Sequence, residues 1–257
     1  MTSQMTTPMT TQATMEGTVA LVTGGSRGIG AATAVRLARA GADVAFTYVR
    51  DKDAADDVAG RIRALGRRAL ALRADSADAR EAVEAVTRAA EGLGGLDVLV
   101  NNAGVGLLGP LESYSLADID RVLAVNVRGV FLASQAAAGR MARGGRIITI
   151  GSCMTQRVPG AGGTLYTTGK SALVGLTKAL ARELGERGIT ANIVHPGPVD
   201  TDMNPADGPY AGGQAALTAV GRFGTAEEVA GAVVYLAGAE AGYVTGAEFS
   251  VDGGHAA

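Results

Sequence analysis

Short apolar runs alternate along this chain with longer stretches whose apolar residues recur at helical spacing. The runs are continuous, which is typical of strands that are covered on both faces. This alternation predicts an α/β fold in which a mostly parallel sheet carries helices on both faces. Strands are expected at residues 18–23, 44–49, 69–73, 96–101, 146–150, 190–195 and 248–251, and helices at 29–40, 54–65, 77–91, 116–141, 165–186 and 226–237.

No linker, repeat or low-complexity tract interrupts this alternation, so residues 17–257 are expected to form a single domain. Residues 1–16 are rich in Thr and Met and have neither a basic start nor an apolar centre. They do not resemble a signal peptide, and we expect a disordered tail.

Composition narrows the classes of partner. A net charge of −2 provides no basic field, so we expect no nucleic-acid partner. No apolar run is long enough to cross a bilayer, and no membrane partner is expected. Cys153 is the one cysteine, which excludes an intrachain disulfide and fits a reducing cytoplasm. No grouping of His, Cys and carboxylates has the spacing of metal ligands, so no metal is expected.

A glycine-rich turn follows the first predicted strand and opens the first predicted helix. Glycines permit a tight turn and a close approach of the backbone, and a helix N-terminus offers free amides to a pyrophosphate. The spacing is Gly-x-x-x-Gly-x-Gly, and its strand-turn-helix context favours a dinucleotide site. The candidate cofactor contacts in the turn are Gly24, Ser26, Arg27, Gly28, Ile29 and Gly30.

The end of the second predicted strand indicates which dinucleotide is bound. Enzymes that select NAD usually place a carboxylate there for the ribose 2′-hydroxyl, whereas this chain has Tyr48, Val49 and Arg50. Arg27 and Arg50 could both reach a 2′-phosphate, which a guanidinium group binds well. The alternative is that both arginines are solvated surface residues. We expect NADP(H), with Tyr48 and Arg50 among its contacts.

A second group of residues has the chemistry of proton transfer. Tyr166 and Lys170 lie four residues apart on a predicted helix and therefore share a face. An adjacent ammonium group lowers the pKa of a phenol, which is otherwise about 10. Ser152 ends a predicted strand, at the edge where open α/β sheets bind ligands. Asn126, inside a predicted helix, is a further candidate, and a packing hydrogen bond is its alternative role.

Together these residues resemble the short-chain dehydrogenase/reductase family over residues 18–254. Each motif is weak alone, but this order and spacing rarely arise by chance. The matching pieces are residues 23–30, Asp75, residues 101–104, Asn126, Ser152, Tyr166, Lys170, Pro196, Gly197 and residues 251–254.

The resemblance implies a Rossmann-like, doubly wound fold and a role for each matching residue. Tyr166 would protonate a carbonyl oxygen that Ser152 polarises. Lys170 would lower the pKa of Tyr166 and bind the nicotinamide ribose, and Asn126 would hold a water in a proton relay. Further cofactor contacts are implied at Asp75 and Ser76 for the adenine, at Asn102, Ala103 and Gly104 for the adenosine side, and at Pro196, Gly197, Val199 and Thr201 for the carboxamide.

One spacing departs from the family pattern. Ser152 lies 14 residues before Tyr166, whereas 13 is commoner and would point to Cys153. The run Ile-Ile-Thr-Ile-Gly-Ser identifies Ser152 as the match, with a longer loop like those of naphthol and polyketide-type ketoreductases. Cys153 and His195 are expected to be structural, and His255 to lie in an exposed tail.

The leading hypothesis is an NADPH-dependent carbonyl reductase, similar to 3-oxoacyl-carrier-protein reductases. Residues 202–221 would form a substrate lid with little charge, which suits a neutral or apolar small molecule or acyl thioester. One alternative is an alcohol or sugar dehydrogenase that works oxidatively. Another is a non-catalytic dinucleotide sensor, which would not need Ser152, Tyr166 and Lys170 together. The resemblance also implies a homotetramer built from the long helices and the last strand.

Overall fold

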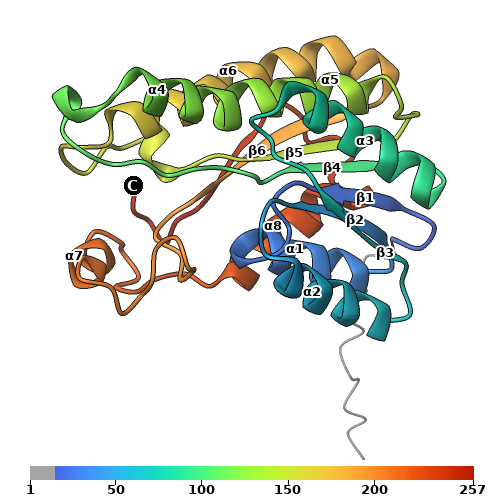
Figure 1. The fold of residues 1–257 in the computed structure, drawn as a ribbon, viewed down its shortest axis with the longest axis horizontal. Coiled ribbons are helices and arrows are strands. Elements are labelled where there is room, and N and C mark those ends of the chain that lie inside the picture. Colours follow the sequence, from blue (N-terminus) through green and yellow to red (C-terminus); the bar gives the residue numbers. More distant parts are fainter. Residues whose placement is uncertain (1–14) are drawn as a thin grey trace, which may run out of the picture.

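The sheet consists of seven parallel strands in the order β3-β2-β1-β4-β5-β6-β7, in a computed structural model that describes residues 15–257 (Figure 1). The order reverses between β1 and β4, and in such sheets ligands bind at the carboxyl ends of the strands beside this point. The predicted doubly wound α/β fold is confirmed. The strands are β1 (Val19–Val22), β2 (Asp43–Tyr48), β3 (Ala69–Arg73), β4 (Val98–Asn101), β5 (Arg146–Ile150), β6 (Thr190–Pro196) and β7 (Glu248–Val251).

Helices cover both faces of the sheet (Figure 1). On one face lie α1, α2 and α8, and on the other α3, α4, α5 and α6. The helices are α1 (Gly28–Arg39), α2 (Lys52–Ala64), α3 (Ala79–Leu93), α4 (Leu116–Leu123), α5 (Val130–Ala138), α6 (Thr164–Leu184), α7 (Ala211–Ala216) and α8 (Ala226–Ala237), with a π-helical turn η2 (Ala124–Gly129) and short 3-10 turns η1 (Leu111–Ser113), η3 (Cys153–Thr155), η4 (Gly185–Arg187) and η5 (Ala239–Ala241).

The apolar runs of the sequence are buried because each strand faces a helical layer on both sides. β1, β4, β5 and β6 are buried along their whole length. Successive side chains of a strand point to opposite faces, so neighbouring residues enter different cores. Ala20 and Val22 of β1 pack under α1 and α8, whereas Val19 and Leu21 pack under α3 and α5. β7, at the edge of the sheet beside β6, is partly exposed.

Three details differ from the sequence-based expectations. Met15 is 3% exposed and donates its amide to the Ala40 carbonyl. The ordered domain therefore includes Met15, which the prediction assigned to a tail of residues 1–16. Residues 1–14 lie outside the described part of the chain. The helix predicted over residues 116–141 is divided by η2, and the predicted lid contains α7. Within residues 15–257, no helix has both the length and the apolar character that a bilayer crossing requires.

His255 is also not exposed as predicted. Its side chain is only 3% exposed because the end of the chain folds back against the domain. Arg157 donates to the His255 carbonyl at 3.0 Å, and the Asp252 carboxylate accepts from the amides of Gly254 and Ala256. The C-terminus therefore closes the same edge of the sheet at which β5 and β6 end (Figure 1).

Candidate active site

The glycine turn between β1 and α1 is held by hydrogen bonds from both neighbouring strands. From β2, the Thr47 hydroxyl accepts the Gly24 amide at 2.9 Å. From the end of β4, the Asn102 side chain donates to the carbonyls of Thr23 and Gly24, both at 2.9 Å. The Thr23 hydroxyl in turn accepts the amides of Asn102 and Ala103, each at 3.0 Å. The ends of β1, β2 and β4 thus form one rigid unit around the turn.

Several positions of this turn have room for glycine only. A Cβ atom at Gly30 would lie 2.2 Å from the Gly24 carbonyl oxygen, and one at Gly25 would lie 2.6 Å from Phe46. Gly24 and Gly28 have φ angles of +63° and +53°, which side-chain-bearing residues rarely adopt. Arg27, the N-cap of α1, makes no side-chain hydrogen bond to the first turn of the helix. The first amides of α1 are therefore uncapped by the chain, which fits a pyrophosphate at this position.

The residues expected at the 2′-phosphate lie around the same turn, and the two arginines among them are exposed. Tyr48 is half-buried at the end of β2, and Arg50 is exposed beside it. Arg27 is paired with Asp202 of the predicted lid, at 3.9 Å, with both side chains 71% exposed. Such an exposed pair is weak, so Arg27 can exchange it for a phosphate at small cost. Arg50 also contributes to lowering the pKa of Asp75.

Asp75 and Ser76 lie in the loop after β3, where they contact residues of α4 and η2. The pKa of Asp75 is lowered because its carboxylate accepts the Ala77 amide and pairs with Arg121 at 3.0 Å, and these effects exceed the desolvation that opposes them. The Ser76 carbonyl lies so near Gly129 that a Cβ there would approach it to 2.3 Å. The loop after β3 is thus fixed against η2, with Ser76 beside a small crevice that Thr23, Asn101 and Ala103 also line.

Ser152, Tyr166 and Lys170 come together beyond the carboxyl end of β5. Ser152 follows β5 directly and is 6% exposed, and Tyr166 and Lys170 lie on successive turns at the start of α6. The Ser152 side chain lies close enough to Tyr166 to influence the pKa of the phenol. Lys170, 5% exposed, donates from Nζ to the Ile150 carbonyl at 2.8 Å and lies 6.0 Å from the centre of the Tyr166 ring. The structure thus brings together the three residues on which the proton-transfer hypothesis depends.

The direction of the Tyr166 pKa shift differs from the sequence-based expectation. Burial raises the pKa of the phenol, and the nearby Ser152 side chain opposes this shift only in part. Burial also lowers the pKa of Lys170 to about 8, since desolvation disfavours its charged form. Desolvation therefore dominates at both residues and favours their neutral forms, and Lys170 is not among the causes of the Tyr166 shift.

Asn126 holds the loop after β4 against the helical layer. It is fully buried in η2, and its amide group forms two hydrogen bonds of 2.9 Å with the backbone N–H and C=O of Val105. A Cβ at Gly104 would lie 3.4 Å from both the Asn126 Oδ1 and the Lys170 Nζ atoms, so this loop passes directly beside the ammonium group. The π turn frees backbone carbonyls from their usual partners, and such turns are frequent at functional sites. A water-holding role for Asn126 stays a prediction.

The predicted carboxamide contacts continue from β6. Gly197 donates its amide to the Val251 carbonyl at 3.1 Å, and a Cβ at this position would lie 2.7 Å from Asp252. Val199 is 5% exposed and pairs with Gly224, while the Thr201 methyl group lies near Gly28. The segment after Pro196 therefore returns to the glycine turn, where Thr201 lies beside Gly28.

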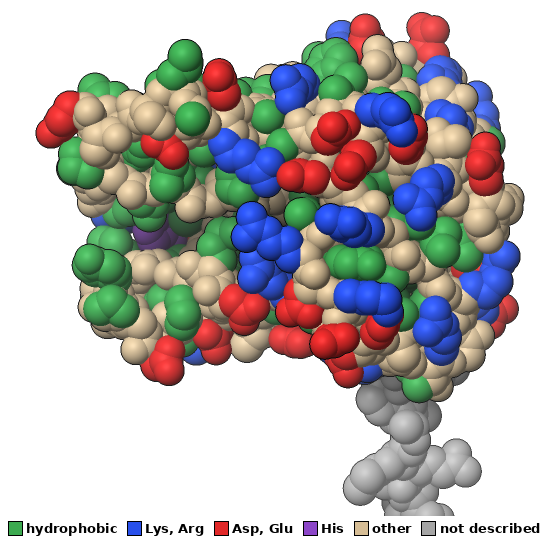
Figure 2. Space-filling view, in the orientation of Figure 1, with side chains coloured by type: hydrophobic (Ala, Val, Ile, Leu, Met, Phe, Trp, Pro, Cys, Tyr) green, Lys and Arg blue, Asp and Glu red, His purple; other side chains and the backbone are tan. Residues whose placement is uncertain are grey.

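Residues 202–221 lie across a hollow from the loop that precedes α4. Figure 2 shows this hollow at the left edge of the molecule, between the lobe that contains α4 and the lobe that contains α7. The Met203 sulfur would lie 3.4 Å from a Cβ at Gly106, so the two lobes meet at this point. Asn204 and Gln214 exchange two side-chain hydrogen bonds that fix α7 within the segment. Exposed apolar side chains occur in both segments: Leu108 and Leu111 lie before α4, and Met203 and Tyr210 lie within residues 202–221.

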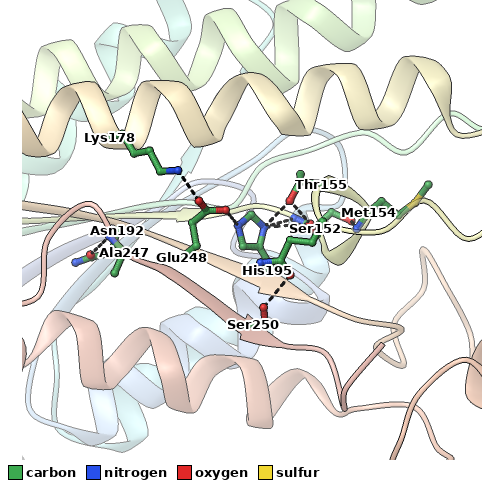
Figure 3. A network of polar contacts seen from close by, with 10 residues as sticks. Ser152, Met154, Thr155, Lys178, Asn192, His195, Ala247, Glu248 and Ser250 are labelled. Atoms are coloured by element: carbon green, nitrogen blue, oxygen red, sulfur yellow. Dashed lines mark hydrogen bonds and ion pairs between the residues drawn. The ribbon is translucent and has the colours of Figure 1, made fainter. Parts of the chain in front are cut away.

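Sequence reasoning missed the residues that hold this site in place. Thr47, 3% exposed, anchors the glycine turn, and its hydroxyl beside the apolar residues 44–46 was the available signal. His195 was expected to be structural, and its imidazole contacts the backbone of Ser152, a contact that the sequence did not indicate (Figure 3). Cys153 is buried as predicted, and burial raises the pKa of its thiol to about 11, which makes it a poor nucleophile.

Comparison with known proteins agrees with this geometry. The family described as enoyl-(acyl carrier protein) reductase matches residues 24–256. The cyclic-di-GMP-binding biofilm dispersal mediator protein of Escherichia coli is 48% identical over 92% of this chain and 96% of its own. The 3-oxoacyl-[acyl-carrier-protein] reductase of Synechocystis is 40% identical over 92% of this chain and 96% of its own.

The solved structures show the same fold at higher identity. A short-chain dehydrogenase from Burkholderia cenocepacia, crystallised in complex with NADP, is 54% identical and superposes with a TM-score of 0.94 over 95% of this chain and 99% of its own. Together with the family match and the convergence of Ser152, Tyr166 and Lys170, this likeness gives an unambiguous assignment. The chain belongs to the short-chain dehydrogenase/reductase family of oxidoreductases.

Proposed function

We propose that this oxidoreductase uses NADPH to reduce a neutral, largely apolar ketone to a secondary alcohol. The observation that carries the proposal is the loop after β4, which joins the two parts of the site. Asn102 holds one end of this loop to the glycine turn, and Asn126 holds the other end beside Lys170. A dinucleotide on the glycine turn and a carbonyl group at Tyr166 are thereby kept in a fixed relation.

Each residue of the cluster has one task. Tyr166 donates its phenolic proton to the carbonyl oxygen, and Ser152 donates a hydrogen bond to the same oxygen. Lys170 provides a positive charge beside the phenolate that forms, and Asn126 keeps the loop in place. NADPH, held by the glycine turn with Arg27 and Arg50 at its 2′-phosphate, supplies the hydride when bound. The NADP complex of the Burkholderia relative supports this choice of cofactor.

Reduction needs the protonated form of Tyr166, which burial stabilises. A phenol that burial keeps protonated near neutral pH is ready to donate a proton to a carbonyl oxygen. An alcohol dehydrogenase needs the phenolate before turnover. Oxidation of an alcohol or sugar is therefore the second activity to test, and we expect it to require a higher pH.

The surroundings of the hollow favour an apolar substrate over one delivered by a carrier protein. The lid contributes Met203 and Tyr210 and carries no Lys or Arg. Three arginines could attract an acidic carrier, and each donates to a backbone carbonyl: Arg128 to Ala77, Arg140 to Ala136 and Arg143 to Glu186. Arg140 and Arg143 precede β5 and so lie at the opposite end of this strand from Ser152. We therefore place free ketones and short acyl thioesters ahead of carrier-bound chains.

A substrate panel tests this proposal. Acetoacetyl thioesters, cyclic diketones and aryl ketones are offered with NADPH or NADH, and oxidation of the cofactor is followed at 340 nm. We expect turnover of at least one uncharged ketone, with a preference for NADPH that is reduced in Arg27→Ala and Arg50→Ala. Turnover only with NADH, or no turnover with any carbonyl compound, would contradict the proposal.

The relative from Escherichia coli gives one reason to test a second function, the binding of a cyclic dinucleotide. Exposed Arg27 and Arg50 beside an uncapped helix N-terminus offer phosphate contacts that need no catalysis. Titration with cyclic di-GMP, alone and with NADPH, tests it. Binding that survives in Tyr166→Phe, in a protein without turnover, would favour this non-catalytic function.

We further propose that residues 17–257 act as one domain within a homotetramer. The exposed Leu123 and Phe131, on α4 and α5, support contacts through these helices, and partly exposed β7 offers a second surface. Light scattering after size exclusion should give four times the protomer mass, and Phe131→Glu should reduce it. A monomer in the wild type would contradict the proposal.

A further inference from the structure

His195 lies directly behind Ser152 and is fully buried (Figure 3). Its Nδ1 atom is 3.2 Å from the Ser152 amide nitrogen and 3.0 Å from the Ser152 carbonyl oxygen. The hydroxyl group of Thr155 lies 3.2 Å from the same atom. One side of the imidazole is thus occupied by the segment that carries the proposed carbonyl-binding hydroxyl.

The neighbouring glycine makes this contact possible. A Cβ at Gly151 would lie 2.5 Å from the His195 Nδ1 atom, so any larger residue at this position would push the imidazole away from the Ser152 backbone. Gly151 itself donates its amide to the Val194 carbonyl at 2.7 Å. The glycine that follows β5 therefore leaves the space that the His195 imidazole occupies.

The other side of the ring meets a carboxylate. The His195 Nε2 atom lies 3.2 Å from the Glu248 Oε2 atom, and the Lys178 Nζ atom holds the other carboxylate oxygen at 2.7 Å (Figure 3). A carboxylate only accepts hydrogen bonds, so it favours the tautomer with the proton on Nε2. The Nδ1 atom then has a lone pair for the Ser152 amide.

Protonation of the ring would reverse this pairing. With a proton on Nδ1, the ring can no longer accept the Ser152 amide and instead donates to the Ser152 carbonyl. The charged groups that face the ring are Glu248 on β7, backed by Lys178, and Lys170 on α6. Glu248 raises the pKa of His195 and Lys170 lowers it, and burial brings the net value below its usual range.

We infer that His195 is a positioning residue: its neutral Nε2–H form, selected by Glu248, holds Ser152 in register with Tyr166, and protonation of the ring releases it. This inference rests on the proposed function, because Ser152 must contact the substrate for its position to matter. Glu248 and Lys178 extend the control to the protein surface, since Lys178 is 57% exposed.

Nuclear magnetic resonance of protein labelled with ¹⁵N-histidine tests the geometry without turnover. The His255→Gln variant assigns the two ring systems. We expect His195, with and without NADPH, to be the neutral Nε2–H tautomer at pH 7.5. In Glu248→Gln the lost negative charge should move its protonation to lower pH, while Glu240→Gln, at an exposed residue without an ion pair among those described, should leave it in place. An Nδ1–H tautomer in the wild type would overturn the inference.

Steady-state kinetics tests the consequence for the reaction. The acid limb of the kcat profile should move to lower pH in Glu248→Gln by the shift seen in the resonance titration. His195→Leu should lose about 10- to 100-fold in kcat, the scale of a misplacement near 1 Å, with the dissociation constant of NADPH unchanged. His195→Asn, whose Oδ1 atom can accept the Ser152 amide, should recover most of kcat and lose the acid limb.

The outcomes separate this inference from the proposed function. The positioning role is wrong if His195→Leu keeps the wild-type kcat, or if the acid limb stays fixed in Glu248→Gln. The reductase assignment remains in both cases, provided that Tyr166→Phe abolishes turnover. If the wild type reduces no ketone, the proposed function fails, and the tautomer and its dependence on Glu248 still decide the geometry. Because Glu248 lies at the sheet edge, its variant avoids the risk of misfolding that His195→Leu carries.

Discussion

The substitution Gly30→Ala is predicted to damage both the stability of the domain and its binding of NADPH. The added methyl carbon would lie 2.2 Å from the Gly24 carbonyl oxygen and 2.5 Å from the Asn102 Nδ2 atom, against ordinary contacts of 3.4–4 Å. The turn must move by about 1 Å, at a cost of about 1–3 kcal/mol for overpacking. Loss of the two Asn102 hydrogen bonds adds about 1 kcal/mol each. We expect a total loss of about 3–5 kcal/mol.

Gly60→Ala is the matched control. Gly60 lies inside α2 with nothing within 4 Å of an added methyl group, so the better helix propensity of alanine should stabilise the domain by about 0.5–1 kcal/mol. Urea unfolding gives both values from the shift of the midpoint at constant slope, and fluorescence titration gives the NADPH dissociation constant. A Gly30→Ala protein as stable as the wild type, with unchanged NADPH affinity, would refute the role assigned to this turn.

Three further predictions follow from the site. Arg27→Ala combined with Arg50→Ala should weaken NADPH binding by about 10- to 100-fold and leave NADH binding nearly unchanged, which isothermal titration measures. Asn126→Ala should cost about 1–3 kcal/mol of stability in urea, because it leaves the Val105 N–H and C=O groups unpaired; equal stability would contradict the clamp. The pKa of Lys170 is about 8 in the folded state, below its usual 10.5. Between these two pH values the unfolded state binds more protons, so the contribution of Lys170 to the free energy of unfolding rises with pH. Lys170→Met should therefore lose that rise between pH 8 and 10.5, and an unchanged slope would contradict it.

The layers of the fold were predictable because covered strands have a distinctive pattern. Every predicted strand is present, and so is every predicted helix except that over residues 116–141, which η2 divides; boundaries differ by a few residues. The exceptions have physical causes. α7 was missed because its sequence, Ala-Gly-Gly-Gln-Ala-Ala, has almost no apolar periodicity. η2 was missed because a π turn arises from the contacts of Asn126 and Gly129 with distant loops, which helical periodicity does not reveal.

The candidate site was predictable in its residues but less so in its electrostatics. The spacing of Tyr166 and Lys170 placed them on one helical face, and the structure confirms that arrangement. The direction of the Tyr166 pKa shift was predicted wrongly, because the cost of burial depends on the surrounding packing and not on the neighbour four residues away. The same holds for His195, whose partners Ser152 and Glu248 are far apart in the sequence.

The central claim is that Tyr166 is the proton donor beside a bound dinucleotide, and Tyr166→Phe tests it most directly. This change removes one oxygen atom and leaves the ring packed against Lys170. With a substrate that the wild type reduces, we predict a loss of about 10²- to 10⁴-fold in kcat with the NADPH dissociation constant within a factor of two or so of wild type. A Tyr166→Phe protein that retains wild-type kcat would contradict the account.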